Sequence, residues 1–207
     1  PSDDLNQACP CAKRVREFLI CMTLEEKAAQ IQCVWLDKAK TMVDDKGNVD
    51  LEKARAAFGQ VHGLGQVGRP SDAGGGLSPR KNAELTNAIQ KFFLENSRLG
   101  IPVIFHEECL HRLAAVGSTS FPQPIGLGAT FDTDLIQRVF EATACEARIR
   151  GTHQALTPVV DVAREPRWGR VEETYGEDPY LVSRMGIAAV RGFQGDALFS
   201  DKKHVIA

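Results

Sequence analysis

Two adjacent carboxylates in the stretch FHEECLH, residues 105–111, are the first side chains that could carry chemistry. Glu107 and Glu108 follow a continuous apolar run, and His106 and His111 flank them. Neighbouring side chains of an extended segment point to opposite sides, so only one of the two glutamates can face a common site. A carboxylate there could accept two hydrogen bonds from vicinal hydroxyls. The residues alone leave three possibilities open: a ligand contact, a solvated loop, or a metal site of unspecific spacing.

A second polar cluster also follows an apolar run; it begins at Arg164 and includes PRWGRVEETYGEDPY, residues 166–180. Three arginines stand there against several carboxylates, and these charged residues are Arg164, Arg167, Arg170, Glu165, Glu172, Glu173, Glu177 and Asp178. Arginine stays charged and offers a rigid fork of donors, so one of them could bind the hydroxyls of a ligand while the others order the loop through ion pairs. Trp168 could stack on a sugar ring or anchor the loop, and we favour the anchor.

Apolar strands and capped helices alternate along the chain after residue 60. A strand is predicted where apolar residues run continuously, and a helix where Ser or Asp precedes Pro or an apolar period. The predicted strands are 62–68, 101–108, 153–162 and one that begins within 204–207, and the predicted helices run from Ser78 to about Ser97, from Asp132 to before Gly151 and from Asp178 to 192–195. Such alternation is typical of parallel strands joined by crossover helices.

The first 60 residues have a different pattern, which predicts a helical lead-in. One helix is expected over about 12–20. A capping box of Thr23 and Glu26 begins a second helix. Its apolar positions recur at helical spacing, at Leu24, Ala28, Ile31 and Val34 or Trp35. We therefore divide the chain into a lead-in, 1–60, and a region of βα units, 61–207.

The placement of polar residues chooses between an open doubly wound sheet and a barrel. A dinucleotide fold would need G-x-G-x-x-G after a strand, whereas GLGQVG lies inside a predicted strand. Polar residues instead follow the strands, as they do in the loops at the active face of a barrel. A complete barrel needs about 250 residues. The predicted fold class is therefore α/β: a partial (β/α)8 TIM barrel, roughly its first half, truncated at the C-terminus.

Composition excludes several classes of protein. The 207 residues are 43% hydrophobic with a net charge of −2, so no basic field is present for nucleic acid or an anionic membrane. No apolar run approaches the roughly 18 residues of a membrane span. The six cysteines lack zinc spacing, and we expect no disulfide. The chain starts at Pro1 without a signal-peptide core and stops inside the run KKHVIA, which predicts a fragment of a longer protein.

Several motifs together resemble one known family. They are MTLEEKAAQI, GLGQVGRPSD, IPVIFHEECLH, FPQPIGLGATFD, LTPVVDVAREPRWGRVEETYGEDPYLVSRMG and RGFQG, and they cover roughly 14–207 in order. The chain resembles the N-terminal (β/α)8 domain of family 3 glycoside hydrolases, which are exo-acting β-glucosidases and β-xylosidases. The resemblance implies an oligosaccharide or small glycoside as substrate, no metal or organic cofactor, and an extracellular or periplasmic location.

The resemblance also implies roles for individual residues. Arg170 matches the arginine that binds the sugar in the −1 subsite, and Glu108 matches the carboxylate that holds sugar hydroxyls. The family often has Gly where this chain has Arg112. The pair Lys203-His204 precedes the last apolar run, so it does not match the family's Lys-His pair at the C-terminal end of a strand.

The catalytic residues themselves are expected elsewhere. The resemblance places the nucleophilic Asp and the acid/base residue after Ala207, in the rest of the barrel and a following domain. The predicted function is the N-terminal portion of a retaining β-glycosidase that acts at non-reducing ends. A catalytically inert product or a sugar-binding remnant is the alternative. Glu at position 108 slightly favours β-xylosides over β-glucosides, because the longer side chain leaves less room for a C6 hydroxymethyl group. An unrelated barrel, such as an aldolase, would need a lysine at a strand end, and no interior predicted strand has one.

Overall fold

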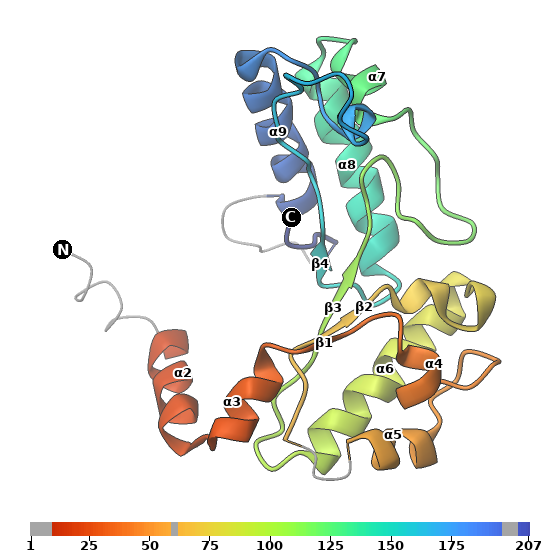
Figure 1. Ribbon diagram of the computed structural model, residues 1–207, viewed down its shortest axis with the longest axis vertical. Helices are drawn as coiled ribbons and strands as arrows, with labels where there is room; N and C mark the ends of the chain where they lie inside the picture. The colour runs from red at the N-terminus through yellow and green to blue at the C-terminus, as the bar shows by residue number, and fades with distance from the viewer. Residues whose placement is uncertain (1–9, 59–61, 196–202) are drawn as a thin grey trace.

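Four short strands lie side by side in the order in which they occur in the chain (Figure 1). They are β1 (Cys33–Val34), β2 (Gln66–Gly68), β3 (Ile104–Glu107) and β4 (Gln154–Ala155). All three pairings are parallel, and Ile206 adds a parallel bridge to Gln154. The computed structural model describes residues 10–58, 62–195 and 203–207. Its consecutive parallel strands confirm the predicted α/β fold, a partial (β/α)8 barrel.

Helices connect the strands and cover them. The helical elements are α2 (Pro10–Cys21), α3 (Leu24–Gln30), α4 (Lys38–Thr41), α5 (Leu51–Ala57), the 3-10 helix η1 (Pro70–Gly75), α6 (Pro79–Asn96), α7 (Pro124–Gly128), α8 (Thr133–Arg148), the 3-10 helix η2 (Val171–Glu173) and α9 (Pro179–Gln194). In Figure 1, α4, α5 and α6 gather at one end of the structure and α7, α8 and α9 at the other. None of these helices is long and apolar enough to cross a membrane.

Local sequence signals explain where the long helices begin. Ser78 accepts a hydrogen bond from the main chain of α6, and Pro79 occupies its first turn. Asp132 caps α8 in the same way, and Asp178 caps α9 from just before Pro179. Each cap satisfies amide groups that have no partner within the helix. The three predicted helix starts are confirmed.

The helix that starts at the Thr23 capping box is shorter than predicted, and it buries a different face. It ends at Gln30, and Leu24 and Ile31 are 77% and 87% exposed. The buried positions are Glu26 and Ala29. Arg98 binds both carboxylate oxygens of Glu26 at 2.8 and 2.6 Å, and the Gly65 amide donates to the Ala29 carbonyl at 2.9 Å. An ion pair and a main-chain hydrogen bond, rather than an apolar stripe, attach this helix to the rest of the chain.

The predicted lead-in is also not purely helical. Residues 33 and 34 form β1 and pair with β2, so the sheet begins well before residue 61. The helical spacing that extended to Val34 and Trp35 was therefore a wrong prediction. The proposed division between residues 60 and 61 falls within 59–61, which lies outside the described residues.

The predicted strands are longer than the observed ones. Only Gln154–Ala155 of 153–162 lies in the sheet, and the other two shrink to Gln66–Gly68 and Ile104–Glu107. Proline explains part of the difference, since Pro102 and Pro158 have no amide hydrogen to donate to a ladder. Val160 is 54% exposed, so its apolar side chain did not mark a buried strand.

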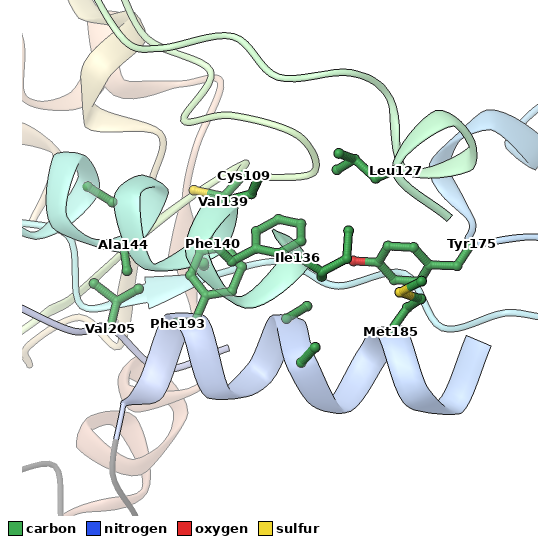
Figure 2. Close-up of a cluster of buried hydrophobic side chains, with 14 of the residues drawn as sticks. Cys109, Leu127, Ile136, Val139, Phe140, Ala144, Tyr175, Met185, Phe193 and Val205 are labelled. Atoms are coloured by element: carbon green, nitrogen blue, oxygen red, sulfur yellow. The ribbon is translucent and has the colours of Figure 1, made fainter. Parts of the chain in front are cut away.

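Two hydrophobic clusters form the interior. One packs β2, β3 and α6 together around residues such as Val67, Phe93 and Phe105. The other joins α8 and α9, and in it Phe140 and Phe193 lie with ring centroids 4.9 Å apart (Figure 2). Cysteine forms no disulfide among the described residues, in which Cys11, Cys21, Cys33, Cys109 and Cys145 are free. The sheet that precedes the loops of the predicted site residues is thus packed on both flanks.

Candidate functional site

The loops that follow β2, β3 and β4 share one edge of the sheet. Because the strands are parallel and neighbouring, their C-terminal ends lie together. Glu107 ends β3, and Glu108 begins the next loop. The arginine loop, defined here as residues 164–173, follows β4. The sequence therefore brings its two polar clusters to the same edge, as predicted.

Glu107 is fully buried, and Ser71 binds both of its carboxylate oxygens. The Ser71 amide donates to Oε1 at 2.9 Å, and the Ser71 hydroxyl donates to Oε2 at 2.9 Å. Burial raises the pKa of Glu107 to about 7, while the two Ser71 hydrogen bonds oppose the shift. Such a pKa would suit a general acid. The geometry argues against that role, because neither oxygen is accessible to a substrate.

Glu108 is only half-buried, and it lies near the arginine loop. Its carbonyl accepts a hydrogen bond from the Ala114 amide at 2.9 Å, which closes the turn after β3. Its negative charge, with that of Asp161, helps to raise the pKa of Arg170. Glu108 and Arg170, which are 62 positions apart in the sequence, are therefore within electrostatic range of each other. Of the two adjacent glutamates, Glu108 is the one left for a ligand.

Arg170 is largely exposed and holds a neighbouring carboxylate. Its Nε lies 2.8 Å from Oε2 of Glu173, one helical turn later, and this bond is the main cause of its raised pKa. Arg167 binds Glu165 in a similar way, with contacts of 2.8 Å from both Nε and Nη2. Two of the three arginines thus form the ion pairs that the sequence suggested. A substrate role for Arg170 stays a prediction.

Beneath this loop, a buried tyrosine anchors the segment that leads to α9. Tyr175 belongs to the cluster between α8 and α9, and Figure 2 shows it near Ile136 and Met185. Gly128 of α7 lies against it so closely that a Cβ there would stand 2.5 Å from the Tyr175 carbonyl oxygen. Trp168 is half-buried, so the structure leaves its role as anchor or platform a prediction.

A group of buried and partly buried polar residues on the β1–β2 side was not recognised from the sequence. Lys38 is buried, and its Nζ donates to the carbonyls of Trp35 and Gly68 at 2.6 and 2.8 Å. It also pairs with Asp72 Oδ1 at 3.0 Å. Arg69 Nε lies 3.7 Å from the other oxygen of Asp72. We name this set, which comprises Lys38, Arg69, Ser71, Asp72 and Glu107, the buried clamp after its buried members Lys38, Ser71 and Glu107; the side chains of Arg69 and Asp72 are 30% and 35% exposed.

The backbone of Arg69 adds a further signal. Its φ and ψ are 47° and 58°, the left-handed region that a residue with a side chain rarely adopts. Its amide donates to the His106 carbonyl at 2.8 Å, which holds the turn against β3. Its guanidinium lies over the Trp35 ring at 6.0 Å. Strained residues of this kind cluster at functional sites. Polar residues directly after the predicted strand 62–68 were the available sequence signal.

Two hollows adjoin Asp72. One of about 450 Å³ is lined by residues that include Trp35, Lys38 and Gly75. The other, of about 570 Å³, lies between η1 and the loop after β3, and Arg112 is among its lining residues. Arg112 donates to the Ser120 hydroxyl at 3.0 Å, so it is tied within its own loop. The edge of the sheet near Asp72 is thus open on two sides.

The histidines near the two glutamates bind separate partners. His106 Nδ1 lies 3.0 Å from the side-chain oxygen of Gln66, and His111 Nδ1 lies 2.8 Å from the Phe121 carbonyl. Burial lowers the pKa of His106. Across 10–58, 62–195 and 203–207, no three His, Cys, Asp or Glu side chains gather as metal ligands. Lys203 and His204 precede the bridge at Ile206, as the sequence suggested.

Comparison with known proteins assigns the family. The sequence model described as "Glycosyl hydrolase family 3 N terminal domain" matches residues 23–207. The chain belongs to glycosyl hydrolase family 3. A β-xylosidase from Formosa agariphila is 45% identical over 119 residues, which cover 54% of this chain and 16% of that protein. Beta-glucosidase C from Emericella nidulans is 32% identical over 198 residues, which cover 92% of this chain and 31% of that protein.

A solved structure agrees with the family 3 assignment. The match to a β-glucosidase from Erythrobacter marinus has a TM-score of 0.83 and 36% identity, and it covers 98% of this chain and 26% of that one. The chain thus spans less than a third of each of these relatives. The described sheet is a partial (β/α)8 barrel of the family 3 N-terminal domain.

Proposed function

We propose that the chain is the N-terminal portion of an exo-acting, retaining β-glycosidase. This enzyme would hydrolyse O-glycosidic bonds at the non-reducing ends of β-xylosides or β-glucosides. Membership of family 3 supports the reaction class, since the relatives named above are a β-xylosidase and β-glucosidases. The single observation that carries the proposal within this chain is that the loops of Glu108 and Arg170 follow neighbouring parallel strands, β3 and β4, at the C-terminal edge of the sheet.

In this proposal, the two residues hold the sugar rather than react with it. The Glu108 carboxylate accepts hydrogen bonds from vicinal hydroxyls, and Arg170 donates to a hydroxyl from the other side. A retaining enzyme needs a nucleophile and an acid/base carboxyl group about 5–5.5 Å apart. We assign both to segments after Ala207. Contacts that tighten as the ring distorts stabilise the transition state more than the bound substrate.

Glu107 does not supply the missing acid. It has the raised pKa that an acid would need, but Ser71 occupies both of its oxygens inside the protein. This geometry supports the second part of the proposal, that residues 1–207 alone do not turn over substrate. They would at most bind sugar.

The experiment compares the complete protein with residues 1–207 on nitrophenyl β-xyloside and β-glucoside. We expect turnover by the complete protein and none by the shorter chain. A complete protein that hydrolysed neither substrate would refute the β-glycosidase assignment. Measurable turnover by 1–207 would instead show that the catalytic carboxylates lie within it.

The substrate preference is proposed to lean toward β-xylosides. Glu108 has one methylene group more than Asp, which leaves less space for the C6 hydroxymethyl group that distinguishes glucose from xylose. The 45% identity with a β-xylosidase over 119 residues supports the same preference. The ratio of kcat/KM for the two nitrophenyl substrates measures it directly.

A further inference from the structure

Glu107 joins three segments of the site at one buried point. Its carboxylate holds the turn after β2 through Ser71. Its carbonyl accepts the Leu156 amide at 3.0 Å, where the chain leaves β4. Its own main chain continues into Glu108. A displacement of Glu107 would therefore move the proposed sugar-binding carboxylate relative to both neighbouring loops.

We propose that Glu107 is a positioning residue that fixes Glu108 in the orientation required for sugar binding. The inference rests on the proposed function, because the sugar contact of Glu108 is part of that function. Burying a carboxylate costs free energy that a neutral side chain of similar shape avoids. Both oxygens of the buried Glu107 carboxylate bind Ser71. We therefore attribute the buried charge to the geometry that it imposes on the turn after β2.

Charged groups from each neighbouring element face Glu107. From the β2 side, the positive charge of Arg69 lowers its pKa and the negative charge of Asp72 raises it. From the turn after α8, Arg150 lies within electrostatic range. In its own loop, burial raises the pKa of the Cys109 thiol, and the negative charges of Glu107 and Glu108 add to this shift. Burial outweighs these contributions, so the carboxylate gains its charge near neutral pH.

The substitution Glu107→Gln removes the charge of Glu107 while keeping the shape of its side chain. Above pH 7 the two Ser71 donors bind an ionised carboxylate, and such charge-assisted hydrogen bonds are roughly twice as strong as neutral ones. Below that pH, the protonated carboxyl group can accept from the Ser71 amide and donate to the Ser71 hydroxyl. The amide of Glu107→Gln offers the same pair of contacts at every pH. This variant therefore mimics the neutral form of Glu107 throughout.

The test measures kcat/KM of the complete protein for a β-xyloside between pH 5 and pH 9, with the released sugar quantified. We expect the ratio of wild type to Glu107→Gln to be close to one at pH 5 and to rise about fivefold above pH 7. Glu84→Gln, at an exposed glutamate on α6, is the matched control and should give a ratio that does not depend on pH. A flat ratio for Glu107→Gln would overturn the inference.

A second variant tests the link through Ser71. Ser71→Ala removes the donor to Oε2 and should move the rise in kcat/KM to higher pH, since a buried charge with one partner fewer is harder to form. A merely structural role of Ser71 would lower activity equally at all pH values. An unshifted pH profile would count against the inference.

Hydrogen exchange separates this inference from the proposed function. In the complete protein, the peptide that covers 69–77 should exchange faster in Glu107→Gln than in wild type at pH 8, and equally fast at pH 5. This difference can be read even if the protein hydrolyses no glycoside, in which case only the proposed function fails. Equal exchange in the two proteins at pH 8 would show that the charge of Glu107 does not hold the loop.

Discussion

The buried clamp and the arginine loop lie at the same edge of the sheet, yet they use charge in opposite ways. In the clamp, Lys38 and Glu107 are buried, and their polar atoms have partners at 2.6–3.0 Å. In the loop, Arg167 and Arg170 are exposed and pair with carboxylates close in sequence. Solvent screens the exposed pairs strongly and the buried ones only slightly. Equal numbers of ion pairs on the two sides therefore do not mean equal rigidity.

This difference assigns separate tasks to the two regions. A buried group that loses its partner is left with an uncompensated charge, so the clamp has essentially one arrangement. Arg170 can exchange Glu173 for a sugar hydroxyl at little cost, because water already competes for the pair. We infer that the clamp fixes the position of the site and that the loop adapts to the substrate.

Removal of the Lys38 ammonium is expected to have the largest effect. Lys38→Ala would leave the carbonyls of Trp35 and Gly68 without their buried donor and Asp72 with the Arg69 contact alone, which should cost about 1–3 kcal/mol of unfolding free energy for each carbonyl. Lys40→Ala is the matched control, since Lys40 lies on the same short helix and makes only an exposed pair with Asp37. Urea denaturation of the complete protein should shift strongly for the first variant and hardly for the second. Similar shifts would contradict the distinction between buried and exposed charge.

The second prediction concerns activity. Arg170→Ala should lower kcat/KM roughly 100-fold, the usual loss when one donor to a transition state is removed, with no change in the circular dichroism spectrum. Arg167→Ala should stay within about twofold of wild type, because Arg167 is bound to Glu165 and has no assigned substrate contact. Unchanged turnover after Arg170→Ala would remove it from the sugar site.

Local signals in the sequence predicted the helices that frame the site. Ser78, Asp132 and Asp178 each cap a helix through contacts within a few residues, so the sequence nearby contains all the necessary information. Strand length was overestimated because apolar composition does not reveal where pairing stops. Val160 continues the apolar run but is 54% exposed and lies outside the ladder.

The buried clamp could not be predicted, because its contacts span the fold. Ser71 and Glu107 are 36 positions apart, and Lys38 reaches Gly68 across 30. Nothing near Lys38 distinguishes it from the exposed lysines that surround it in the sequence. The pair Glu107-Glu108 was recognised, but only the fold reveals that Ser71 engages the first and leaves the second accessible.

The pH dependence of stability tests the clamp by itself. Glu107 holds its proton up to about pH 7 in the folded protein, whereas an ordinary glutamate releases it near 4.5. The folded state therefore binds more protons between these values, and this contribution to the global free energy of unfolding is lost as the pH rises from 4.5 to 7, although the ionised carboxylate binds the two Ser71 donors more strongly. The slope should be at most about 1.4 kcal/mol per pH unit, and Glu107→Gln should flatten it. Urea denaturation of both proteins at pH 5 and pH 7.5 would measure the difference, and equal slopes would contradict the prediction.

The smallest expected effect lies at Glu108, which connects the two regions. Its main chain continues from Glu107 of the clamp, and its charge reaches Arg170 of the arginine loop. Glu108→Asp should withdraw the carboxylate by one methylene group and make room for C6 of a glucoside. The ratio of kcat/KM for nitrophenyl glucoside over xyloside should then rise roughly fivefold, within the range that one methylene group provides.

Glu141→Asp, on α8, controls for a general effect of the shorter acid and should leave that ratio unchanged. If the clamp sets the direction of Glu108, the single variant Glu108→Asp should show the gain in glucoside preference at pH 8. The double variant, which also carries Glu107→Gln, should not show this gain at the same pH. The loop after β3 would then be less ordered, so the shorter carboxylate at position 108 would no longer be held in a position that makes room for C6. Additive effects of the two substitutions would instead indicate that Glu108 takes its direction from its own loop, independently of the buried clamp.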